Sequence, residues 1–212
     1  MGLTSLWREY DKDNVFIISP NDKYHEKISA SLKIFKDVGI EIQKHTVIVF
    51  PDNFKDVTKM EELPASYFYP DIIMLFPLLN EEGVMYQYLH ELGHIITGRF
   101  PQEIMWAAEI ISCSCNFFLF PQDTNCYLNF ISPLILPLKQ NQKNFQILGE
   151  ALIKDPGLVY TGNYHIESTL YSYYQLNKDF DFIGLLKSFS GRQTDSALKE
   201  EWTNRIKTIL TV

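Results

Sequence analysis

The sequence predicts an α+β fold in which a β-containing first part is followed by a mostly helical second part. The β-prone runs that we identify lie in the first eighty residues, and segments with helical periodicity follow them. The chain has 212 residues, of which 46% are hydrophobic and 14% aromatic. This is enough apolar material for one compact body, so we expect residues 1–212 to form a single domain with an α/β lobe over 1–80 and a helical lobe over 81–212.

The first part contains three predicted strands and one predicted helix. Runs rich in Val and Ile at 15–18 and 46–50 each end at a proline, as strands commonly do. Between them, apolar residues recur at helical spacing over 24–38, and Gly39 ends this helix. We expect the third strand, over 72–76, to be an edge strand, where an extended peptide could pair with its backbone; the alternative is an ordinary core strand.

The second part is predicted to be mostly helical. Gly98 follows one long apolar helix and Pro101 precedes the next, which predicts a tight connection between the two helices. The predicted helices cover about 82–97, 103–120, 144–154, 163–176, 180–189 and 195–210.

Composition excludes several classes of function. The chain carries 19 Lys and Arg against 26 Asp and Glu, a net charge of −7, and has no strongly basic window, so we expect no nucleic-acid partner. Its longest apolar stretches are broken by prolines and aspartates, so we expect no membrane span. Three cysteines without zinc-finger spacing, together with a start that lacks a signal-peptide pattern, favour a cytoplasmic location.

The strongest chemical signal is His90-Glu91-Leu92-Gly93-His94, an HExxH sequence inside the predicted helix 82–97. Residues four apart lie on one helix face, so His90 and His94 can offer two nitrogens to one metal ion. Because apolar residues occupy nearly every side of this helix, we expect the two imidazoles and Glu91 to be buried, which is costly unless an ion pairs with them. The motif therefore predicts one Zn²⁺ per chain.

A catalytic zinc site needs a third protein ligand. Glu109 is the only charged residue within 104–111 of the next helix, and we take it as that ligand. Glu103 is the rival, but an acid at a helix start is already favoured by the helix dipole. For Glu109 to reach the histidines, either the two helices cross at a substantial angle or the second begins near Ile104, and we expect the later start.

These motifs resemble those of gluzincin zinc metallopeptidases, with Trp106-Ala107-Ala108-Glu109 matching the W-x-x-E element. The chain is most similar to the small peptidase MA-like catalytic domains; the ImmA/IrrE group of peptidases is the second candidate. The resemblance implies a zincin-like fold with the active-site cleft between the two lobes, and a peptide or protein substrate. The G-x-M-E-N element of the alanyl aminopeptidases is absent, which favours an endopeptidase.

The resemblance also implies a mechanism. Glu91 would act as general base toward a metal-activated water, and Tyr164 would donate a hydrogen bond to the oxyanion, with His165 as the alternative donor. The competing hypothesis is a catalytically silent zincin-fold protein that serves as a metal-containing binding or regulatory module.

Overall fold

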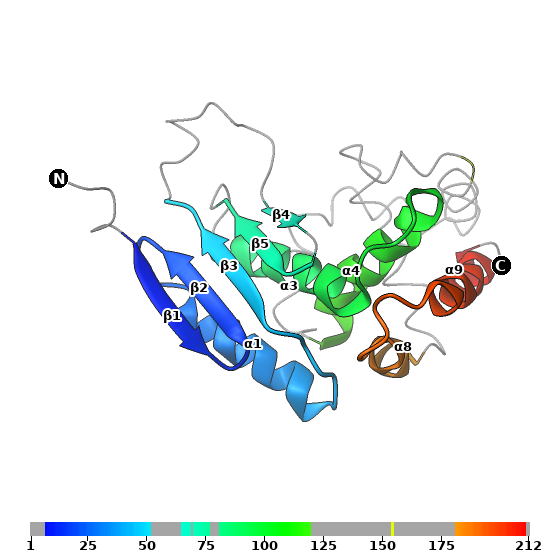
Figure 1. Cartoon of the computed structure of the whole chain (residues 1–212), viewed down its shortest axis with the longest axis horizontal. Helices are drawn as coiled ribbons and strands as arrows, with labels where there is room; N and C mark the ends of the chain where they lie inside the picture. Colours follow the sequence, from blue (N-terminus) through cyan, green and yellow to red (C-terminus); the bar gives the residue numbers. More distant parts are fainter. Residues whose placement is uncertain are drawn as a thin grey trace, which may run out of the picture.

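The computed structural model describes residues 7–51, 65–68, 70–76, 81–119, 154 and 181–210. Within these residues the predicted α+β class is confirmed: there are a five-stranded mixed sheet and five α-helices, of which one lies between the second and third strands and four follow the last strand (Figure 1). Predicted helix 163–176 lies outside the described residues, and so does predicted helix 144–154 apart from Lys154.

The sheet has the strand order β1-β2-β3-β5-β4. The three central strands β2, β3 and β5 are parallel, and each outer strand is antiparallel to its neighbour. The strands are β1 Arg8–Lys12, β2 Val15–Ser19, β3 His45–Val49, β4 Ala65–Phe68 and β5 Ile72–Leu75. The predicted strands at 15–18, 46–50 and 72–76 thus correspond to β2, β3 and β5.

The prediction that strand 72–76 lies at the sheet edge is wrong. β5 pairs with β3 on one side and with β4 on the other, so among the strands that the structure describes β4, not β5, is at this edge. The sequence around β4 lacks the long run of β-branched residues that marks β2 and β3.

The opposite edge strand, β1, was also not predicted. Four of its five residues, Arg8-Glu9-Tyr10-Asp11-Lys12, are charged and exposed, a composition that protects an edge strand from pairing with other chains. A two-residue turn joins β1 to β2, and both turn residues, Asp13 and Asn14, have positive φ (54° and 67°), as a type I′ hairpin requires.

One face of the sheet forms the core. In β2 and β3 buried residues alternate with partly exposed ones, so a single face of each strand is covered. Helices α1 (His25–Asp37) and α3 (Glu81–Thr97) lie behind the sheet in Figure 1 and cover this face. Val47, Ile73, Leu92, Ile110 and Leu185 all belong to the same core, which therefore joins the sheet to the C-terminal helices.

The connection after α3 follows the predicted pattern. Gly98 has φ 69°, and its N–H donates to the His94 carbonyl at 2.8 Å, which ends the helix. A short 3₁₀ turn, η2 (Gln102–Ile104), precedes α4 (Met105–Leu119), so the expected late start of the second helix is confirmed.

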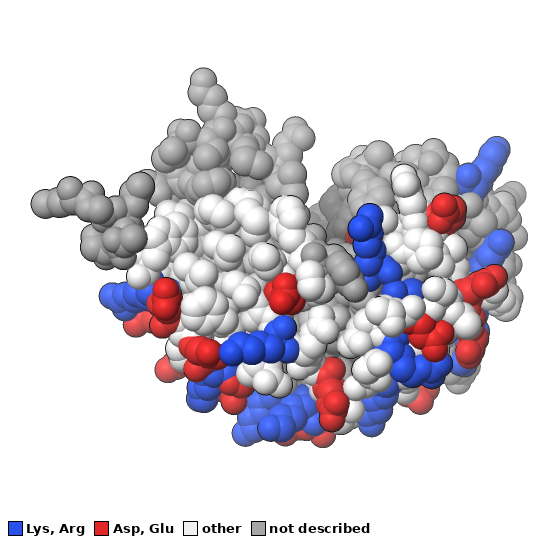
Figure 2. Space-filling view, in the orientation of Figure 1, with Lys and Arg blue, Asp and Glu red and all other residues white. Residues whose placement is uncertain are grey.

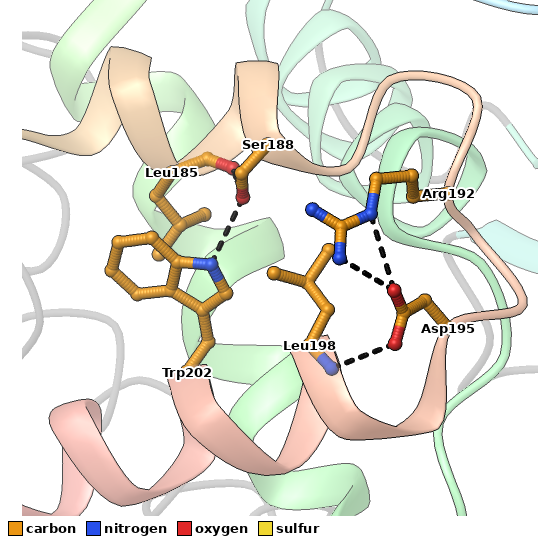
Figure 3. A network of polar contacts seen from close by, with 6 residues as sticks. All are labelled: Leu185, Ser188, Arg192, Asp195, Leu198 and Trp202. Atoms are coloured by element: carbon orange, nitrogen blue, oxygen red, sulfur yellow. Dashed lines mark hydrogen bonds and ion pairs between the residues drawn. The ribbon is translucent and has the colours of Figure 1, made fainter.

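Helices α8 (Phe182–Ser188) and α9 (Ser196–Leu210) complete the described core. The Trp202 indole N–H donates to Ser188 Oγ at 2.9 Å, which joins the two helices (Figure 3). Asp195 accepts the Leu198 N–H at the start of α9 and pairs with Arg192 at 2.6 Å.

Two further properties bear on partners. No helix in the described ranges combines the length and the apolar character needed to cross a bilayer. On the face shown in Figure 2, acidic and basic groups are interspersed, and the surface over β2, β3 and β5 is largely uncharged.

Candidate metal centre

The two histidines of the HExxH sequence lie on one face of α3. Their ring centroids are 5.0 Å apart, and the rings meet edge to face. The His90 side chain is 6% exposed and that of His94 11%. The one-turn spacing predicted from the sequence therefore places two imidazoles side by side in a largely buried position.

Glu109 of α4 meets both histidines. Its Oε2 lies 3.3 Å from His90 Nε2, and its Oε1 lies 3.4 Å from His94 Nε2. The expected convergence of His90, His94 and Glu109 is thus present, with one carboxylate oxygen directed at each imidazole.

The electrostatics of Glu109 favour a carboxylate anion. Burial alone would raise the pKa of Glu109, but the charge of the His94 imidazole and hydrogen bonds to both histidines outweigh burial and bring the pKa well below its usual range. A buried anion between two imidazoles is a suitable partner for a cation.

Glu91 is a second carboxylate at the same place. An oxygen of Glu91 and one nitrogen each of His90 and His94 all lie within 4.8 Å of one another, a grouping that could hold a metal ion. The Glu91 residue is 7% exposed, as is Glu109. The centre therefore offers two nitrogens and two carboxylates, all supplied by α3 and α4.

The chemistry of the donor set suits a metal ion such as zinc. Imidazole nitrogen and carboxylate oxygen are common zinc ligands. The separations between histidine nitrogen and Glu109 oxygen are 3.3 and 3.4 Å, each to a different carboxylate oxygen, so the carboxylate lies close to both imidazoles.

The remaining predicted residues lie elsewhere or outside the described part. Glu103 is exposed in η2, away from the core, in keeping with a helix-start role. Trp106 of the W-x-x-E element is buried in the core beside Ala107 and Ala108. Tyr164 and His165 lie outside the described residues.

Two residues next to the centre were not singled out from the sequence. Gly93 of α3 and Ser112 of α4 approach each other so closely that an added Cβ at Gly93 would lie 2.6 Å from Ser112 Cα. The available signal was a glycine inside a helix, which is unfavourable there unless something needs the space.

Comparisons with protein families, with curated proteins and with solved structures found no match for this chain. The case for a metal centre therefore rests on the side chains of α3 and α4.

Proposed function

We propose that this chain is a zinc-dependent endopeptidase with a zincin-like fold and one zinc ion per chain. The observation that carries the proposal is the convergence of His90, His94 and Glu109, with one Glu109 oxygen 3.3 Å from His90 Nε2 and the other 3.4 Å from His94 Nε2. The order of the elements supports it, since the third ligand follows the HExxH helix on the next α-helix, as in the gluzincin pattern.

His90, His94 and Glu109 would hold the ion. Zinc bound there would supply a Lewis acid that lowers the pKa of a water and polarises a peptide carbonyl. Glu109 suits the ligand role because each of its oxygens already contacts one imidazole.

Glu91 would be the general base. It follows His90 directly on α3, and its carboxylate lies beside both histidine nitrogens. In this role Glu91 takes a proton from the attacking water and delivers it to the leaving amine. Tyr164 or His165 would then donate to the developing oxyanion.

The decisive variant is Glu91→Gln, which keeps the size of the side chain and removes the proton acceptor. We expect the variant to retain zinc and the fold while its rate of peptide cleavage falls by roughly 10²- to 10⁴-fold. Glu103→Gln is the matched control, because it makes the same change at an exposed position; its rate should equal that of the parent.

Zinc content and cleavage of a diverse peptide library would be measured in parallel for all three proteins. Zinc in the parent with no chelator-sensitive cleavage by it would favour the silent binding module. Equal cleavage by the parent and Glu91→Gln would exclude the mechanism. Absence of zinc from the parent after zinc-supplemented expression would exclude the metal centre itself.

A further inference from the structure

A close approach between α3 and α4 lies beside the candidate metal centre. A Cβ atom added at Gly93 would lie 2.6 Å from Ser112 Cα, 2.8 Å from Ser112 Oγ and 3.0 Å from Ser112 Cβ. The nearest of these atoms is backbone, so a change of side-chain rotamer cannot relieve the overlap. Only glycine fits at position 93 while the two helices keep this separation.

This contact is adjacent to the donors on both helices. Gly93 lies three residues after His90 and directly before His94, and Ser112 lies three residues after Glu109. Three residues correspond to about 4.5 Å along a helix. The separation of the helices at Gly93 and Ser112 therefore governs how far the Glu109 carboxylate is from the two imidazoles.

Both residues are locally unfavourable. Glycine within a helix costs conformational entropy relative to alanine. Ser112 is 0% exposed, and its hydroxyl has no hydrogen-bond partner among the residues that the structure describes, which leaves a buried polar group uncompensated. Local costs of this kind are expected where function rather than stability determines the residue.

We propose that Gly93 and Ser112 are positioning residues, whose contact holds α3 and α4 at the separation that lets His90, His94 and Glu109 bind one metal ion. The inference rests on the metal centre of the proposed function but not on peptidase activity. It assigns Ser112 a steric role, in which a small side chain is required and the hydroxyl is not a ligand.

Gly93→Ala tests the contact. We expect the folded variant to bind Zn²⁺ about 10- to 100-fold more weakly than the parent in competition with a chelator, the range typical for loss of an outer-shell partner. The absorption spectrum of bound Co²⁺ should also change, because the ligand geometry changes. Ile28→Ala is the control: it removes fully buried volume from α1 and should lower thermal stability without changing metal affinity in the folded protein.

Two changes at Ser112 separate steric from chemical roles. Ser112→Ala keeps the small volume and should keep the parent's metal affinity. Ser112→Thr adds a methyl group at the contact and should weaken binding in the same direction as Gly93→Ala, and it provides the test if Gly93→Ala does not fold.

Parent-like affinity and Co²⁺ spectra in Gly93→Ala, or in Ser112→Thr if that variant is used, would overturn the inference while leaving the proposed function intact. Loss of metal binding in Ser112→Ala would overturn the steric role. If the parent binds no metal, the metal centre fails and the inference fails with it.

Discussion

Glu109 and Glu103 lie on neighbouring elements but differ in their surroundings. Glu109 is buried against two histidines, whereas Glu103 is exposed in η2. Glu109→Ala should therefore weaken zinc binding by more than the roughly 10- to 100-fold typical of an outer-shell change. Glu103→Ala should cost only about 0.3–1 kcal/mol in unfolding free energy through the helix dipole. Chelator competition and urea unfolding measure the two effects, and equal zinc retention would show that the wrong carboxylate was chosen.

His45 connects β3 to the helix that carries the centre. It is 1% exposed; its Nδ1 lies 3.1 Å from the Gln43 carbonyl oxygen and its Nε2 3.3 Å from the Tyr88 hydroxyl. Neutral imidazole suits this site, with Nδ1–H donating to Gln43 and Nε2 accepting from Tyr88. Burial lowers the pKa of His45 below its ordinary value of 6.5, in spite of the Gln43 hydrogen bond.

This shift predicts a pH dependence of stability. Because the unfolded chain binds the proton more readily, stability from His45 is present above about pH 6.5 and is lost as the pH falls below it, by at most about 1.4 kcal/mol per pH unit. His45→Gln should reduce the loss of unfolding free energy between pH 7.5 and 5.5, measured with urea on metal-free protein. An unchanged pH dependence in His45→Gln would contradict the neutral assignment.

At the scale of the elements, Lys199 of α9 supports the end of α3. Its Nζ donates to the Arg99 carbonyl at 2.6 Å and lies 5.3 Å from the centre of the Phe100 ring. Lys199→Met keeps most of the aliphatic stem but leaves this carbonyl without the ammonium donor. We expect a loss of about 1.5–3 kcal/mol in unfolding free energy, as for other hydrogen bonds to charged groups. The same substitution at exposed Lys33 of α1 is the control and should have little effect.

Elements with a strong period or clear end signals could be predicted from the sequence. The connection between α3 and α4 is the best case, since Gly98 and Pro101 predicted a helix end and a restart that the structure confirms. Strand β1 could not be predicted because four of its five residues are charged, so it lacks the apolar residues typical of a strand. The edge position was predicted for β5 because the sequence of β4 gives only a weak strand signal. Strand order depends on long-range pairing, which local patterns do not contain.

The candidate centre was more predictable than the sheet. Helical geometry alone brings His90 and His94 together. Glu109 could be predicted as the third ligand because it is the only charged residue in an apolar stretch of the next helix. The contact between Gly93 and Ser112 could not be predicted in this way, because a glycine inside a helix indicates a close approach but does not identify the residue of the other helix that it meets.

For the molecule as a whole, metal binding should stabilise the entire described fold against unfolding, since α3 and α4 share one core with the sheet and with α8 and α9. A ligand that binds only the folded state stabilises it by about 2.7 kcal/mol at a free concentration of 100 Kd. Zinc should therefore raise the thermal midpoint of the metal-free parent but not that of Glu109→Ala. Calorimetry with and without zinc tests this, and identical midpoints for the parent in the two conditions would be contrary to expectation.

The contact between Lys199 and Arg99 joins residues 100 positions apart, whereas the candidate metal donors all lie between positions 90 and 109. A ribosome makes the chain from its N-terminus at about 5–20 residues per second. Both donor-bearing helices are therefore complete several seconds before α9 exists. In the cell, the nascent chain therefore carries the candidate donors His90, His94 and Glu109 before α9, whose Lys199 binds the carbonyl after α3, has been synthesised.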